Sequence, residues 1–341
     1  MDLSDALSPD RTGAPTIQCD ANSVPWLEPK HVNLLDLAND IDQCGLDGVT
    51  TKYALSLAEW RKVAQEIASL YGRGAISSSC DVIINAWVNT TLAPHALSFP
   101  VYGTSLELKD VQQRMRQTPP DIAGAQKVIF EAVLNPRMRA LQLVGRFMRL
   151  QPFKEFGYLI DAGALAFYRG NIPASYMTIV PVIEGILLRW MGYPDHTNPS
   201  RRKPEFKDLR AFVGDIGTRE PRPLLPLFFD SWEKTVHSIV DDHLYKHTQA
   251  GPSADDFNRH LALHLLQDRR FCTTENVTRA FLLIDTLSEL YICEKRLADP
   301  RWSVSNDEAG THTQAYSDAL ASQKATPYPE SVLFATHEKC R

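Results

Sequence analysis

The sequence predicts an all-α protein, and three observations support this prediction. Nearly every segment with a clear hydrophobic period repeats apolar residues at three and four positions, which is the period of a helix. The sequence shows no alternation of strands and helices of the kind that builds a parallel sheet. At 341 residues and 44% hydrophobic content, the chain is long and apolar enough to bury a sizeable core.

The first third of the chain divides into two parts. Residues 1–30 are rich in Pro, Asp, Ser and Thr, lack a period, and are expected to form a disordered lead. Residues 31–118 are expected to form an N-terminal helical region of unknown function, with its clearest helix at Leu57–Tyr71. The short apolar segment Cys80–Thr91 suits a helix or a strand, because it contains a run of β-branched residues.

The prolines at positions 119 and 120 suggest a boundary, after which residues 120–298 are expected to form the main helical domain. Along the chain, helices are predicted at Ser105–Gln117, Asp121–Leu134, Pro136–Leu150, Lys154–Tyr168, Pro173–Trp190, Phe206–Ile216, Leu227–Tyr245 and Thr274–Leu297. Residues 299–341 contain Pro, Ser, Thr, Asp and Gly throughout and are predicted to be a loosely ordered tail.

Charge and composition restrict the class of protein. A net charge of −5 argues against a protein that coats nucleic acid, so any RNA contact should be local and transient. The six cysteines are scattered and suit a reducing cytoplasm. The N-terminus has no basic and apolar signal pattern, and the most apolar run, Tyr176–Met191, is too short and too polar to span a bilayer. We therefore expect a cytoplasmic protein without membrane contact.

The stretch richest in reactive side chains runs from Asp255 to His264. Ser253 and Asp256 resemble a capping pair, so a helix is predicted to begin here. That helix carries an asparagine and an arginine in its first turns and a histidine one to two turns later. At about 100° per residue, His260 and His264 lie on one face.

An arginine followed after four to six residues by a histidine is typical of the HEPN superfamily of helical ribonuclease and toxin domains. The spacing alone is not specific, and it occurs twice in this chain. The match from Arg189 to His196 is interrupted by a glycine and a proline and so leaves its helix. The match from Arg259 to His264 stays on one predicted helix.

The surroundings of the second match resemble the C-terminal end of bacterial HEPN-like domains, and the resemblance covers roughly residues 120–298. It is carried by Phe257–His264, Thr274–Asn276, Ala280–Leu290 and the upstream stretch Pro181–Leu188, which resembles a Glu-Gly helix of those domains. One departure is Leu265, where such sequences often have Gly. This departure bears on how the helix packs after His264 and on activity.

The resemblance implies an HEPN-like helical bundle and metal-independent RNA cleavage, in which a ribose 2′-hydroxyl attacks the adjacent phosphate. His264 would be the general base or acid, because an unperturbed imidazole titrates near working pH. Arg259 would hold the phosphate, and Asn258 and His260 could orient the phosphate or the leaving oxygen. No cofactor is implied. The family pattern also implies a homodimer with two motifs facing one cleft, a possible regulatory partner protein, and a toxin or abortive-infection role against phage.

Glu184 is the main supporting residue predicted outside the motif. It lies among apolar residues of the predicted helix Pro173–Trp190, so its carboxylate should be at least partly buried and needs a partner. Arg259 or a histidine of the motif helix is a natural candidate. A local approach to Arg189 on the same helix is the alternative.

Two groups of basic residues are candidates for RNA contact. Arg139, Arg146 and Arg149 fall near one face of a predicted helix and could touch the RNA backbone, or they could be solvated or paired with acids. The loop residues Arg201, Arg202 and Lys203 could lie beside the site, although short charge runs are usually just solvated.

Two other functions compete with the ribonuclease. One is a catalytically inactive HEPN-like scaffold that binds a partner protein, RNA or a nucleotide, which Leu265 and the acidic balance of the chain favour. The other is a metal-dependent hydrolase using the pairs His243–His247 and His260–His264. No glutamate follows the first histidine as in zincins, and histidine near a helix C-terminus has an ordinary electrostatic role. We therefore predict no metal site.

Overall fold

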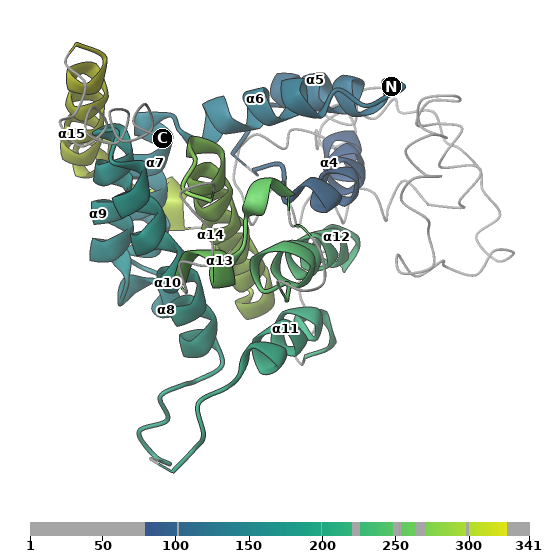
Figure 1. Cartoon of the computed structure of the whole chain (residues 1–341), viewed down its shortest axis with the longest axis vertical. Helices are drawn as coiled ribbons and strands as arrows, with labels where there is room; N and C mark the ends of the chain where they lie inside the picture. The colour runs from purple at the N-terminus through teal and green to yellow at the C-terminus, as the bar shows by residue number, and fades with distance from the viewer. Residues whose placement is uncertain are drawn as a thin grey trace, which may run out of the picture.

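The computed structural model describes residues 79–100, 102–198, 200–219, 226–247, 252, 254–263, 271–297 and 300–325. Within these ranges every regular element is helical and no strand occurs, so the predicted all-α class is confirmed (Figure 1). The predicted lead at residues 1–30 and the helix at Leu57–Tyr71 lie outside the described residues.

Short connections join the helices along most of the chain (Figure 1). The α-helices are α4 (Ser79–Leu92), α5 (Ser105–Met115), α6 (Ile122–Val133), α7 (Pro136–Gln142), α8 (Gln151–Lys154), α9 (Gly157–Tyr168), α10 (Ile172–Trp190), α11 (Phe206–Gly214), α12 (Pro226–Ser238), α13 (Arg259–Leu263), α14 (Thr274–Lys295) and α15 (Asn306–Ala325). Two π-helical segments, η3 (Leu143–Phe147) and η5 (Ile239–Leu244), continue α7 and α12. Single 3₁₀ turns are η2 (Ala93–His95), η4 (Ile216–Thr218), η7 (Ala254–Asp256) and η8 (Pro300–Ser303).

Helix α14 is the central element of the described part, and α6, α10 and α12 pack around it (Figure 1). Every residue from Asn276 to Leu290 is buried, including the polar ones. A helix that is buried on all sides needs internal partners for its polar side chains, because an unpaired buried polar group is costly. The contacts of α14 therefore determine where several charged residues of the other helices lie.

Helix α10 is the second core element and packs between α9 and α14. Its length and composition would allow it to cross a membrane, but 56% of its most apolar window is buried inside the fold. The close approach of α9 requires a glycine, because a Cβ on Gly163 would lie 2.6 Å from the Cδ1 atom of Ile179. These contacts make α10 a core helix, as its wide apolar surface predicts.

The segment that suited either a helix or a strand, Cys80–Thr91, is helical and forms most of α4. Helix α5 packs against both α4 and α6. Buried apolar residues from α4 through α15 belong to one hydrophobic core. The boundary predicted at the prolines 119 and 120 therefore does not separate two cores in the described part, because α5 and α6 bury their apolar faces against each other across it.

The prediction of a loosely ordered tail is wrong for residues 306–325, which form α15 and pack on α7 and α9. Tyr316 is 1% exposed, stacks on Tyr168 at 5.1 Å between ring centroids, and donates a hydrogen bond to Asp161 at 2.6 Å. The sequence hides this helix because its buried face consists largely of alanine, so its hydrophobic pattern is weak.

The predicted helix Pro136–Leu150 is α-helical only to Gln142 and continues as the π-helical segment η3. Gly145 lies against the backbone of η8, and a Cβ at this position would meet the Cα of Arg301 at 2.7 Å. A π-helical insertion inside a helix is rare and changes which residues face the core. The contact between Gly145 and η8 therefore lies inside the π-helical segment. A contact so far apart in sequence leaves no trace in the local hydrophobic pattern.

Candidate functional site

Glu184 lies on α10 among the buried residues Val182, Ile183 and Ile186 and is itself only 7% exposed. A carboxylate at this depth is stable in its charged form only when cations or hydrogen-bond donors reach it. The residues that reach Glu184 therefore define the first part of the candidate site.

Two cations share the carboxylate of Glu184. Arg259, the first residue of α13, donates from Nε and Nη2 to Oε2 at 2.8 and 2.7 Å. Lys203, from the loop between α10 and α11, donates from Nζ to Oε1 at 3.1 Å. We call these three residues the Glu184 cluster. The predicted contact between Glu184 and Arg259 is confirmed, and Arg189 pairs with Glu155 instead.

An aromatic stack supports the arginine of this cluster. The Cζ atom of Arg259 lies 4.1 Å from the centroid of the Phe206 ring, and Tyr245 stacks on the same ring at 5.2 Å between centroids. His260 meets Phe206 edge-on at 5.5 Å. Burial, with a smaller contribution from the Glu184 charge, raises the pKa of Tyr245, so that ring is neutral. The cation–π contact fixes the plane of the guanidinium.

Asn258 does not have the role predicted for it. The residue is 3% exposed, and its Nδ2 donates to the carbonyl oxygens of His243 and Lys246 at 3.2 and 2.8 Å. Its Oδ1 accepts from the backbone amide of His260 at 2.8 Å, as an N-cap side chain does. The amide is therefore used to begin α13 and to tie it to the end of η5, so it is not available to orient a phosphate.

The motif helix starts later than predicted. Instead of beginning after Ser253, α13 begins at Arg259, because Asp255 and Asp256 have positive φ angles of 45° and 60°. Contacts with α14 accompany this left-handed turn: Arg279 donates to the Asp255 carboxylate at 2.7 Å, and Asn276 donates to the Asp255 carbonyl at 2.7 Å. The capping pattern that predicted an earlier start considers only residues close in sequence. It could not take account of these partners on α14.

The structure describes α13 as far as Leu263, so His264 and Leu265 lie outside the described residues. His260, one residue after Arg259, lies within the described part and contacts Phe206.

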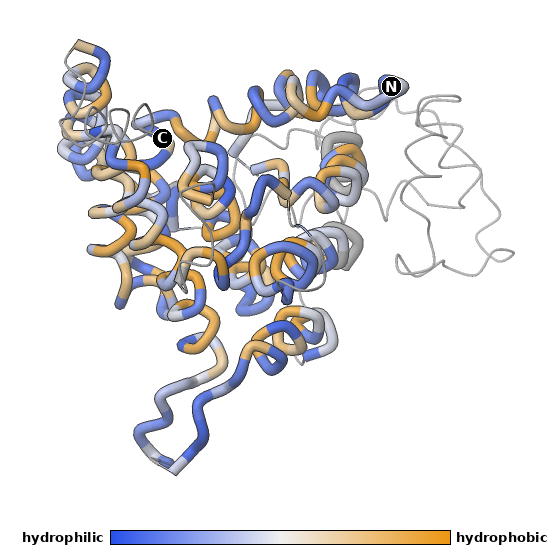
Figure 2. Tube along the Cα trace, viewed as in Figure 1, coloured by the Kyte–Doolittle hydropathy of each residue, from blue (hydrophilic) through white to orange (hydrophobic). Residues whose placement is uncertain are grey.

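The loop between α10 and α11 projects from the body of the molecule and is largely hydrophilic (Figures 1 and 2). Its three predicted RNA contacts have different surroundings. Arg201 donates to the carbonyl oxygens of Gly192 and Met191 at the end of α10, at 3.3 and 3.2 Å. Arg202 is 80% exposed and pairs with Glu205. Of the three, Lys203 is the residue that the structure brings to Glu184.

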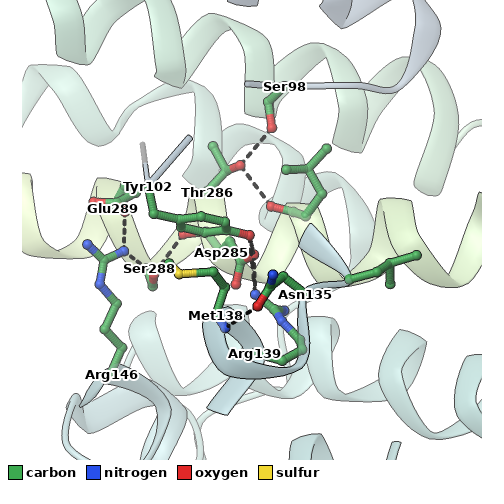
Figure 3. Close-up of polar contacts among 12 residues, drawn as sticks. Ser98, Tyr102, Asn135, Met138, Arg139, Arg146, Asp285, Thr286, Ser288 and Glu289 are labelled. Carbon is green, nitrogen blue, oxygen red and sulfur yellow. Dashed lines mark hydrogen bonds and ion pairs between the residues drawn. The ribbon is translucent and has the colours of Figure 1, made fainter. Parts of the chain in front are cut away.

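The predicted RNA-binding face of Arg139, Arg146 and Arg149 is wrong for its first two members. Arg139 is 2% exposed and pairs with Asp285 at 2.5 Å, while Arg146 is fully buried and pairs with Glu289 (Figure 3). Arg149 is partly exposed and pairs with Glu308 at 2.9 Å. The alternative of arginines paired with acids is therefore the correct one here: Arg139 and Arg146 point toward α14, and Arg149 reaches Glu308 on α15.

This buried network is a feature that the sequence interpretation missed. Tyr102 donates to the Asp285 carboxylate at 2.5 Å, and Arg146 also donates to Ser288 at 3.0 Å (Figure 3). Burial and the neighbouring carboxylate raise the pKa of Tyr102 well above its usual value. Two acids four residues apart in the apolar helix α14 were the available signal, because such acids require buried cations.

Among the described residues no group of three or more His, Cys, Asp or Glu side chains comes together, and His264 of the second predicted histidine pair lies outside them. His243 Nδ1 instead accepts a hydrogen bond from the backbone amide of Ala254 at 3.1 Å. An open hollow of about 460 Å³ between α7 and α15, lined by Arg137, Leu141, Ala309, Gly310, Thr313 and Gln314, contains none of the predicted site residues.

Comparisons with protein-family models, with curated proteins and with solved structures find no match to this chain.

Proposed function

We propose that this protein is a metal-independent endoribonuclease of the HEPN type, with Arg259 and His264 as its catalytic residues. The observation that carries the proposal is the fixed position of Arg259 at the start of α13. There it is held by the buried carboxylate of Glu184 and by the ring of Phe206. A guanidinium fixed in this way, a few residues before a histidine, suits the recognition of one phosphate beside a proton-transfer group.

The proposed reaction is an internal transesterification. The 2′-oxygen of a ribose forms a bond to the adjacent phosphorus, and the bond from phosphorus to the 5′-oxygen of the next nucleotide breaks. The products are a 2′,3′-cyclic phosphate and a 5′-hydroxyl. His264 takes the proton from the 2′-hydroxyl or gives one to the leaving oxygen. Arg259 stabilises the charge that develops on the non-bridging oxygens.

One histidine cannot easily perform both proton transfers across a single bond. The proposal therefore includes a homodimer in which two motifs face one cleft, so that each supplies one transfer. RNA is the transient partner, a regulatory partner protein is possible, and the proposed location is the cytoplasm. The proposed biological role is that of a toxin or abortive-infection protein that acts against phage.

The test is RNA cleavage by purified full-length variants. His264→Ala should lower the rate by about 10²–10⁴-fold, and Arg259→Lys by about 10²-fold or more, because lysine cannot reproduce the fork of donors. Arg219→Lys is the matched control. That arginine also pairs with a glutamate, Glu294, and stacks on a phenylalanine, Phe212, at 3.6 Å, but it lies outside the site. It should lose similar stability and keep full activity.

Cleavage should continue in the presence of a chelator and leave a cyclic phosphate. Full activity of both His264→Ala and Arg259→Lys would refute the ribonuclease. In that case the protein would be better described as a catalytically inactive scaffold. The pairing of Arg259 with Glu184 is compatible with a scaffold, because the carboxylate neutralises half of the positive charge of the Glu184 cluster. Loss of activity with a chelator would favour the metal-dependent hydrolase instead.

A further inference from the structure

We infer that Lys203 and Arg259 together bind one backbone phosphodiester of single-stranded RNA, with Glu184 fixing Arg259 and bringing Lys203 beside it. This inference rests on the proposed function and adds a second phosphate ligand to it. The three side chains come from α10, the loop after it, and α13, so the tertiary structure assembles the pair.

The geometry of the cluster supports a shared phosphate. Arg259 binds Oε2 of the carboxylate and Lys203 binds Oε1, so the two cations are set apart by the two oxygens of one planar group. The non-bridging oxygens of a phosphodiester have a similar separation. The cluster has a formal charge of +1, from two cations and one carboxylate, which matches the single negative charge of an internal phosphodiester.

The two cations differ in how firmly they are held. The side chain of Arg259 is 12% exposed and is fixed by two hydrogen bonds and an aromatic ring. Lys203 is 56% exposed, lies on a hydrophilic loop, and makes one contact to the carboxylate (Figure 2). The carboxylate is buried, but the ammonium group that contacts it is largely in solvent, so this single contact holds the lysine side chain less firmly than the contacts of Arg259 hold the arginine. Lys203 can therefore exchange the carboxylate for a phosphate oxygen while Arg259 keeps its place.

A matched control lies on the neighbouring helix. Lys207 is 70% exposed and pairs with Glu205 at 3.4 Å. It therefore resembles Lys203 in exposure, in charge and in having a carboxylate partner, but its partner is not Glu184. Replacing either lysine by glutamine removes one positive charge.

The experiment measures binding of an uncleavable 2′-O-methyl RNA oligonucleotide to the full-length protein across a series of salt concentrations. For Lys203→Gln, the slope of log affinity against log salt should become shallower by about 0.7, the contribution of one phosphate contact on a single strand. Lys203→Arg should restore the slope. For cleavable RNA, the KM of Lys203→Gln should rise. Lys207→Gln should leave both the slope and the KM unchanged.

Two outcomes would overturn the inference. Either Lys203→Gln keeps the wild-type slope, or Lys207→Gln lowers the slope equally, which would show diffuse attraction instead of a paired contact. In both cases RNA cleavage by the wild-type protein would leave the proposed function intact. A wild-type protein that neither binds nor cleaves RNA would refute the proposed function and this inference together. Thermal unfolding checks that each variant is folded.

Discussion

Glu184 occupies a position on α10 that a leucine would fill at lower desolvation cost. Replacing a buried ion pair by apolar residues is often neutral or stabilising, so such a pair is weak evidence for a stabilising role. Under the proposed function, Glu184 is a positioning residue that fixes Arg259.

The burial of His243 is expected to make the stability of the fold depend on pH. Burial lowers its pKa below the ordinary value of 6.5, and the charge of Asp242 opposes this only in part. The pKa of His95 is lowered by burial and by the charge of Arg279. The unfolded chain therefore binds more protons than the folded one below pH 6.5. Stability is fully present above that pH and is lost as the pH falls through and below it.

We predict that His243→Asn reduces this loss of stability on acidification. The asparagine Oδ1 can replace Nδ1 as the acceptor for the Ala254 amide, but the side chain cannot take up a proton. The measurement is the free energy of unfolding in urea at pH 7.5 and at pH 5.5. Identical differences between the two pH values for wild type and variant would show that His243 does not contribute.

At the scale of elements, α7 with its π-helical continuation packs a polar stripe against a polar stripe of α14. Arg139 pairs with Asp285, and Arg146 pairs with Glu289 (Figure 3). The two arginines follow one another along α7 and η3, and the two acids follow one another along α14. Tyr102 joins the first pair through its hydroxyl, and Arg139 also donates to that hydroxyl at 3.3 Å. Matching charges in this way permits one alignment of the two helices and penalises others, because a slipped register leaves buried charges unpaired.

Breaking one of these pairs should destabilise the protein strongly. We predict that Asp285→Ala lowers the free energy of unfolding by about 3–5 kcal/mol, because it leaves the buried Arg139 cation uncompensated. The double variant Arg139→Met with Asp285→Leu should lose much less, since both charges are removed together. The partly exposed pair Arg114 and Asp110 is the control, and Asp110→Ala should cost at most about 1 kcal/mol.

Chemical denaturation of the four proteins measures these differences. A double variant less stable than Asp285→Ala would show that the pair contributes net stability and not only specificity of packing.

At the scale of the whole molecule, one core extends from α4 to α15. The last described helix, α15, packs on α7 and α9, and its Tyr316 ring is buried against Tyr168. The helix therefore belongs to the same cooperative unit as the candidate site and is not an appended tail.

We predict that Tyr316→Ala lowers the free energy of unfolding by about 3–5 kcal/mol, as expected for a large aromatic side chain removed from a core. Tyr158→Ala is the control, because that ring is 69% exposed, and its loss should cost at most about 0.5 kcal/mol. Thermal and urea unfolding measure both. If the two variants proved equally stable, α15 would be energetically independent of the core.

The amino-acid sequence alone determined the features that depend on neighbours along the chain. The helical class and the approximate positions of the helices followed from hydrophobic period and from helix-ending residues, because both act within a few turns. The sequence also indicated that the Glu184 carboxylate needs a cationic partner, because it lies in an apolar helix, but only the tertiary structure selected Arg259 over a motif histidine or Arg189.

The tertiary structure alone decided which faces meet. The same spacing that placed Arg139 and Arg146 on one face is compatible with solvent or with a carboxylate partner, and only the position of α14 distinguishes the two. The left-handed turn at Asp255 and Asp256 likewise involves partners on α14, about twenty residues away in sequence. Such contacts join residues that no local period connects, so they arise only when the helices pack together.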